Sequence, residues 1–191
     1  GLGEEPGAIK VQSLSQMLTS SQSNIKSVIL GEYIKGLTAF NNLLLNCNQI
    51  EEVDISKLDL SNVTSANSIF KGCTSLKKVN ISNPTTTNIT DFSNVLSGTG
   101  IESLSDVNME KLDMSACTNM QYFLSDCNQL ETVRFPVLNT SKVTNLQYLL
   151  KGCTNLREAN LNGLDTSAVT YVNYWMDGCI NLVNVDISKL D

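Results

Sequence analysis

Residues 143–168 read VTNLQYLLKGCTNLREANLNGLDTSA, and this pattern returns every 26 residues along the chain. A repeat of this length indicates a solenoid or a similar array, in which each unit buries its apolar side chains against its neighbours. Two columns set the register of the repeat. One holds five of the six cysteines, Cys47, Cys73, Cys127, Cys153 and Cys179, and the other holds a threonine in each unit, Thr38, Thr64, Thr90, Thr118, Thr144 and Thr170.

This register divides the 191 residues into one array with atypical ends. We expect six repeats over residues 37–191, of which the last is incomplete. The third repeat holds Thr99 in the cysteine column and has 28 residues. The sixth cysteine, Cys117, stands in a column that is otherwise aliphatic. Residues 11–36 are predicted to form a degenerate N-terminal capping repeat, and residues 1–10 a linker or an expression remnant.

The first half of a repeat has the pattern of a short helix. Thr144 and Gln147 have the spacing of a capping box, and three leucines follow at helical spacing. Gly152 ends this stretch, in a column that holds only Gly, Asn or Asp, the residue types that tolerate a left-handed backbone. The sequence therefore predicts a helix of about two turns in each repeat.

The second half of a repeat has the alternation of a strand. Leu156, Ala159 and Leu161 are predicted to point inward, while Glu158 and Asn160 point outward. We therefore expect an α/β repeat fold, a right-handed solenoid similar to leucine-rich repeats, with short parallel strands on one side and short helices on the other.

The third repeat leaves two strand registers open. Both the pair Ile101 and Leu104 and the pair Leu104 and Val107 have the required three-residue step. We prefer residues 107–109 as the strand, because this choice keeps the ten-residue step from Val107 to Cys117. In either register the two extra residues disturb the stacking locally.

Residues 58–82, LDLSNVTSANSIFKGCTSLKKVNIS, resemble the 26-residue repeat of bacterial surface proteins, the BspA-like branch of the leucine-rich repeat family. The resemblance covers roughly residues 37–191. It implies a solenoid on a bacterial cell-surface or secreted protein, often an adhesin-like array. It carries over no catalytic residues, because the family shares none.

Composition excludes several kinds of chemistry. The chain has no histidine, which removes imidazole metal ligands and histidine-dependent nucleophiles. Its 13 Lys and Arg against 19 Asp and Glu argue against nucleic acid as a partner. Apolar runs are too short to span a membrane. We expect no cofactor, no metal and no enzymatic activity.

The cysteine column invites a disulfide or metal interpretation. It lacks C-x-x-C pairs, and neighbouring units of a solenoid lie farther apart than a disulfide allows. We therefore interpret Cys47, Cys73, Cys127, Cys153 and Cys179 as a structural column of buried free thiols.

Two surfaces are candidates for binding. The first comprises the outward sheet positions, where carboxylates outnumber basic residues and a basic protein or peptide is the favoured ligand; the alternative is a solvated face with no partner. The second is an aromatic stripe on the helix flank, suited to a glycan or a partner protein; the alternative is rings that cover the neighbouring helix. The sheet positions are Glu52, Asp54, Lys78, Asn80, Asp106, Asn108, Arg134, Glu158, Asn160 and Asp186, and the stripe is Tyr122, Tyr148, Tyr171 and Tyr174.

An Asp or Asn recurs in the LDxS turn, as at Asp59, Asp113, Asn139, Asp165 and Asp191. A calcium column is conceivable, but the glycine-rich calcium repeat is absent. Capping of turn N–H groups by these side chains is the simpler interpretation.

Taken with the resemblance, these features predict a non-enzymatic protein- or glycan-binding, adhesin-like module that acts outside the cell or on its surface. The expected partner is a host or bacterial surface protein or a glycan, and the chain is expected to be a monomer. The alternative function is a structural spacer, or a modular attachment protein of a phage or a secretion system, with no ligand of its own.

Overall fold

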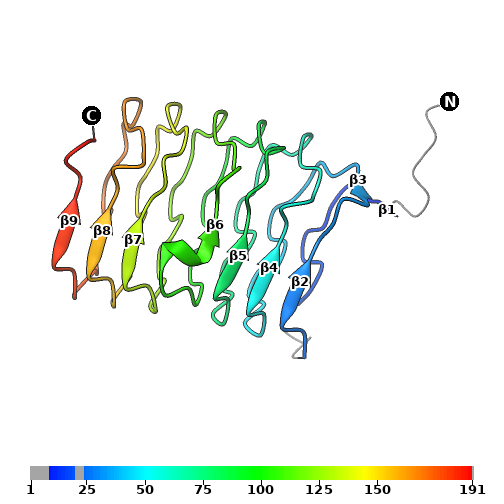
Figure 1. The fold of residues 1–191 in the computed structure, drawn as a ribbon, viewed down its shortest axis with the longest axis horizontal. Coiled ribbons are helices and arrows are strands. Elements are labelled where there is room, and N and C mark those ends of the chain that lie inside the picture. The colour runs from blue at the N-terminus through cyan, green and yellow to red at the C-terminus, as the bar shows by residue number, and fades with distance from the viewer. Residues whose placement is uncertain (1–8, 20–23, 191) are drawn as a thin grey trace.

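The computed structural model describes residues 9–19 and 24–190. The chain winds into a solenoid in which β2 and β4 to β9 lie side by side along one face, with β2 near one end of the array and β9 at the other (Figure 1). The strands are β1 (Ile9–Lys10), β2 (Ser27–Ile29), β3 (Ile34–Lys35), β4 (Glu52–Asp54), β5 (Lys78–Asn80), β6 (Val107–Asn108), β7 (Thr132–Arg134), β8 (Glu158–Asn160) and β9 (Asn184–Asp186).

The strands form two principal parallel sheets. One has the order β2-β4-β5-β6 and the other β7-β8-β9, while β1 and β3 form a small sheet of their own. Val53 pairs with Val79, and Ala159 pairs with Val185, so the pairing follows the 26-residue repeat. The predicted parallel strands and their register are confirmed.

The core lies between the strands and the turns opposite them. Leu156, Ala159 and Leu161 are 0%, 3% and 0% exposed, as the alternation predicts, and Glu158 is exposed. Equivalent side chains from successive coils form one continuous apolar cluster. Each coil has too few apolar residues to fold alone, so stacking provides the core.

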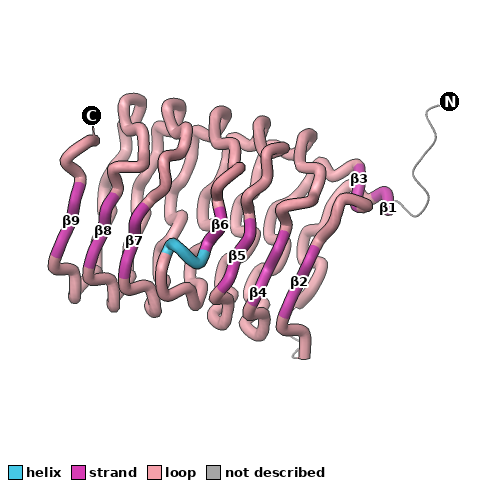
Figure 2. Tube along the Cα trace, viewed as in Figure 1, coloured by secondary structure: helices cyan, strands magenta, loops and turns pink. Residues whose placement is uncertain are grey.

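The predicted helices are wrong. Within residues 9–19 and 24–190 the single helix is the 3₁₀ turn η1, Leu104–Asp106, and the side opposite the strands consists of turns (Figure 2). Tyr148 and Gly152 both have positive φ, +59° and +74°, and two left-handed residues four positions apart interrupt an α-helix. The left-handed backbone expected at Gly152 is confirmed, but it belongs to a turn and not to a helix end.

Hydrogen bonds between coils explain this conformation. The N–H groups of Leu146, Tyr148 and Leu150 donate to carbonyls one coil further on, at 2.9, 3.0 and 2.8 Å. In an α-helix they would bond to carbonyls of their own segment. The capping box is also wrong, because the Thr144 hydroxyl donates to the carbonyl of Thr118. The side of the turns is therefore bonded from coil to coil, as the side of the strands is.

The third repeat interrupts the sheet. Val107 pairs with Val79 of the preceding coil, which confirms the preferred register. The following coil is contacted by a different segment, since Ser103 forms an isolated bridge with Thr132. The turn η1 lies between these two segments, so the extra residues separate the sheet that ends at β6 from the sheet that begins at β7.

The N-terminal region packs on the array. Val11, Leu14, Met17 and Leu18 are partly buried against the core, in the region predicted to be a capping repeat. Residues 1–8 of the predicted linker lie outside the described residues, while Ile9–Lys10 form β1. In the part of the chain that the structure covers, no helix has the length and apolar character needed to cross a bilayer.

Candidate interaction site on the strand face

The outward side chains of β2, β4 to β9 and η1 form one surface, which we call the strand face. It carries the ten positions predicted from the sequence, although Asp106 lies in η1 and not on a strand as expected. Asn80 and Asn108 are direct neighbours in the register, and so are Glu158 and Asn184. Five carboxylates against two basic residues give this surface about half of the net charge of −6.

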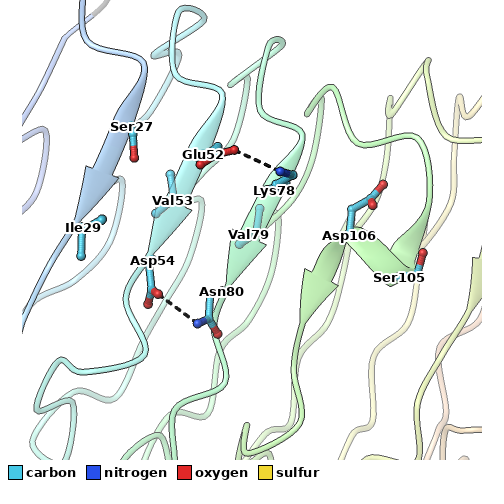
Figure 3. A pocket seen from close by; sticks show the side chains of 10 residues that line it. All are labelled: Ser27, Ile29, Glu52, Val53, Asp54, Lys78, Val79, Asn80, Ser105 and Asp106. Atoms are coloured by element: carbon cyan, nitrogen blue, oxygen red, sulfur yellow. Dashed lines mark hydrogen bonds and ion pairs between the residues drawn. The ribbon is translucent and has the colours of Figure 1, made fainter.

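The N-terminal half of the strand face contains a shallow groove of about 440 Å³, which we call the first groove (Figure 3). Its floor is the buried pair Val53 and Val79, and Ile29, 75% exposed, stands at one side. The opposite side is formed by Ser105 and Asp106 of η1. The groove is therefore open, is lined by polar side chains as well as by apolar ones, and is closed on one side by the inserted turn.

An ion pair and hydrogen bonds hold the charged side chains of the first groove in place. Lys78 forms an ion pair with Glu52, with Nζ 3.3 Å from Oε1. Asp54 accepts the Ser56 N–H at 2.8 Å. It also accepts an Asn80 N–H at 3.0 Å (Figure 3). Burial alone would raise the pKa of Asp54, but these hydrogen bonds and the nearby Lys57 lower it below its usual value. Asp54 therefore stays ionised at neutral pH.

The C-terminal half holds a second groove of about 530 Å³ over β7, β8 and β9, which we call the second groove. Ser103 and Ser105 form its boundary toward the first groove. Asn160 donates to Asp186 at 3.0 Å, which repeats the contact between Asn80 and Asp54. Among the described residues Arg134 forms no ion pair, so its guanidinium is a free donor in this groove.

The cysteine column lies inside the array. All six cysteines are free; Cys179 is partly buried and the others are buried. Burial raises the pKa of Cys73 and of Cys117, each to about 12, so these thiols stay protonated at neutral pH. Among the described residues no group of three or more Cys, Asp or Glu could hold a metal ion.

Three tyrosines form a stack on the side of the turns. The rings of Tyr122 and Tyr148 lie 4.5 Å apart at 2°, and those of Tyr148 and Tyr174 lie 5.1 Å apart at 4°. The Lys151 ammonium lies 5.3 Å from the Tyr148 ring centroid. Tyr174 is 59% exposed, and Tyr171, which takes no part in these stacked pairs, is 54% exposed. The stripe thus presents ring edges more than ring faces to solvent.

The tyrosine column has an unusual backbone. Tyr122, Tyr148 and Tyr174 have φ of +57°, +59° and +60°, where the first three repeats hold Asn42, Ser68 and Asn94. A left-handed residue other than glycine costs about 1–2 kcal/mol, and asparagine tolerates it best. A stacked aromatic pair returns about 0.5–1.5 kcal/mol beyond the area that it buries. The two effects are of similar size, so stacking roughly offsets the strain.

The LDxS residues cap turns. Asp59 Oδ1 accepts the Ser61 hydroxyl at 2.6 Å, and Asp165 accepts that of Ser167 at 2.6 Å. Hydrogen bonds from Ser61 and Ser167 lower the pKa of Asp59 and of Asp165. Asp191 lies outside the described residues. The N–H groups of Ser61, Ser115 and Ser167 donate to Oδ1 of Asp59, Asp113 and Asp165 at 3.2, 2.9 and 3.1 Å, so the predicted capping of turn N–H groups is confirmed for these three aspartates.

The fold and the strand face define a repeat protein of the leucine-rich-repeat type, with parallel strands stacked at a period of about 26 residues. The chain belongs to the family described as "Mycoplasma protein of unknown function, DUF285", a BspA-like repeat family whose model matches residues 12–133 and 99–191. The resemblance of residues 58–82 to this kind of repeat is confirmed.

A solved structure supports the fold. A leucine-rich repeat protein from Bacteroides ovatus superimposes with a TM-score of 0.61 at 15% identity, over 98% of this chain and 51% of that one. The chain therefore spans about half the length of the protein that it matches. No curated protein is similar enough to count as a relative. At this identity the likeness shows the fold alone.

Sequence reasoning missed the groove walls. Ser103 and Ser105 border the grooves, and Ile29 lies at the side of the first groove, but none of them was a candidate. The 28-residue length of the third repeat was the available signal for the two serines. Ile29 lies in the degenerate first unit, where no column marks it.

Proposed function

We propose that the chain is a non-enzymatic protein-interaction module, adhesin-like, from a bacterial cell-surface or secreted protein, and that it binds through the strand face. The observation that supports this most directly is the continuous row of outward polar and charged side chains across successive coils, hollowed into two grooves. Solenoids use extended surfaces of this kind for binding.

The chemistry of the grooves favours binding over catalysis. A two-carboxylate mechanism needs one carboxyl group whose pKa is raised so that it can act as an acid. Here hydrogen bonds from Ser188 lower the pKa of Asp186, and the pKa of Asp54 is lowered too. Both carboxylates are therefore poor general acids, and both suit the recognition of a positive charge.

A basic protein surface is the partner that fits this face best. The excess of carboxylates attracts cations, and ion pairs in open grooves weaken as salt increases. Val53 and Val79, the floor of the first groove, are covered by their own neighbours, so apolar contacts contribute less there. We therefore expect rapid, salt-dependent binding of a polar partner.

The test compares two variants that remove the same charge. Glu52→Gln with Glu158→Gln removes two carboxylates from the strand face. Glu32→Gln with Asp177→Asn removes two exposed carboxylates elsewhere. The chain is immobilised and screened against extracellular-matrix proteins, bacterial surface proteins and glycans, and each hit is measured again with both variants at two salt concentrations.

We expect at least one protein to bind the chain and the control, and to bind the strand-face variant several-fold more weakly. Hits that bind both variants alike would place binding elsewhere. A chain that binds nothing in this screen would contradict the proposal and favour the structural spacer.

A further inference from the structure

The turn η1 divides the strand face into two separate half-sites. Ser105 lines both grooves, from opposite sides, so it lies on the boundary between them. Ser103 N–H donates to the Asp106 carboxylate at 3.2 Å, and Ser105 N–H donates to the Ser103 hydroxyl at 3.3 Å. These bonds close the turn on itself and hold it in place. We call this turn, residues 103–106, the ridge. A partner that uses the whole strand face must contact the surfaces on both sides of it.

The first half-site favours a cation. Its only basic residue, Lys78, is neutralised by Glu52 at 3.3 Å. Asp54 and Asp106 remain, and each is oriented by a backbone N–H, from Ser56 and from Ser103. Two oriented carboxylates that form no ion pair among the described residues make this groove a receptor for a lysine or arginine side chain.

The second half-site offers a positive charge at the edge that lies next to the ridge. Arg134 is exposed on β7, the strand next to the ridge, and no described residue forms an ion pair with it. A guanidinium holds a carboxylate through two parallel N–H donors, which is a specific and directional contact. Glu158 and Asp186 stand further along this groove, on β8 and β9. The free donor therefore lies on the strand of this groove that is nearest the ridge.

The spacing of the half-sites fixes the spacing of the ligand. Asp54 lies on β4 and Arg134 on β7, with β5, β6 and the turn η1 between them. Neighbouring strands of one sheet are roughly 4.8 Å apart, and the break between β6 and β7 adds to the last step, so the two groups are separated by at least roughly 14 Å along the array. An extended chain covers roughly 3.4 Å per residue, so at least about four residues span this gap.

We propose that the two grooves form one bipartite site for an extended protein segment, with a lysine or arginine held by Asp54 or Asp106 in the first groove and an aspartate or glutamate on Arg134. The inference rests on the proposed function, since it names the ligand chemistry of the same face. The ridge makes the two contacts distinct, because a segment must cross it to reach from one groove to the other.

The experiment uses synthetic peptides as probes. One peptide carries two lysines, four neutral residues and two glutamates, and a second has the reverse order. A third replaces the glutamates with lysines, and a fourth replaces the lysines with glutamates. Fluorescence anisotropy measures the binding of each peptide to the full chain, to Arg134→Glu and to the control Glu32→Gln.

We expect one of the two mixed peptides to bind the chain and the control about tenfold more tightly than the all-lysine peptide. In Arg134→Glu this order reverses, because the second groove then favours lysine. Asp54→Asn weakens the mixed peptide without this reversal. Since Arg134 is exposed, its replacement is expected to preserve folding, and a thermal melt checks this.

Two results would overturn the bipartite site. One is an unchanged order of affinities in Arg134→Glu, and the other is that the all-lysine peptide binds the chain best. If no peptide binds but a screened protein binds through Glu52 and Glu158, the bipartite site is wrong while the proposed function stands. If neither binds, both are wrong.

Discussion

The Sγ atom of Cys73 lies 3.0 Å from the carbonyl oxygen of Leu44, 29 residues earlier in the chain. The same contact joins Cys153 to Leu124 at 3.1 Å and Cys179 to Leu150 at 3.1 Å. Each thiol therefore donates to the carbonyl of a turn in the preceding coil. The cysteine column thus combines a small apolar side chain with a hydrogen bond between coils.

The first prediction concerns thiol reactivity. Only the thiolate reacts rapidly, and burial raises the pKa of Cys73 to about 12. We expect Cys179, which is partly buried, to react first with a thiol reagent at pH 8, and the buried thiols to react only after denaturation. Mass spectrometry of the labelled peptides measures the order. Fast native labelling of Cys73 would contradict the buried column.

The second prediction concerns alkaline pH. The folded state holds Cys117 at a pKa of about 12, above its ordinary 9.0, so the proton is bound more tightly in the folded state. The stabilisation is complete below pH 9 and is lost as pH rises toward 12, by about 2 kcal/mol at about pH 10.5. Valine occupies this column in other repeats, at Val63 and Val143.

The matched variant is therefore Cys117→Val, which we expect to change stability by less than about 1.5 kcal/mol at pH 8. Urea denaturation of both proteins at increasing pH should show a gentler loss of unfolding free energy in the variant. Parallel curves would mean that the thiol of Cys117 does not stay protonated in the folded state.

The third prediction concerns a close approach of two coils. A Cβ atom on Gly163 would lie 2.2 Å from the carbonyl oxygen of Pro136 and 2.3 Å from that of Phe135. Gly163→Ala must separate two backbone segments, and we expect a loss of about 1–3 kcal/mol in the free energy of unfolding. Gly31→Ala is the control, because a Cβ there meets nothing within 4 Å. Equal denaturation midpoints would contradict this packing.

The fourth prediction concerns the tyrosine stack. Tyr148→Asn places in the fifth coil the residue that the first and third repeats hold at Asn42 and Asn94. Because relief of the left-handed strain offsets the lost stacking, we expect the melting temperature to change by only a few degrees. A large drop would show that the rings mainly stabilise the array. Unchanged stability with lost binding to a screened partner would add the stripe to the interaction surface.

Most of the fold could be predicted from the 26-residue length of the repeat. The 26-residue columns gave the parallel strands, their register and the inward side chains such as Leu156 and Ala159, because stacking places equivalent residues side by side. The same columns placed the strand-face residues on strands, except Asp106, which lies in η1. The third repeat was also resolved, since Val107 pairs with Val79 as preferred.

The helices could not be predicted correctly, for a physical reason. The spacing of Leu146, Leu149 and Leu150 fits both a helical turn and two consecutive tight turns, and only the backbone bonds between coils separate the two. Asn42 and Asn94 were compatible with a left-handed turn, but Tyr148 in the same column concealed it. The grooves were missed because they depend on where the inserted residues fold, as at Ser105.

The central claim is that the strand face, divided by η1, is the binding surface. The most direct measurement is the map of amide chemical-shift changes in the isotope-labelled chain when the mixed peptide or a screened partner is added. We predict that the largest changes cluster in β4, β5, η1 and β7, including Asp54, Ser105 and Arg134, with little change at Tyr148 and Gly152. Changes confined to the side of the turns, with β4 to β9 unaffected, would contradict the claim.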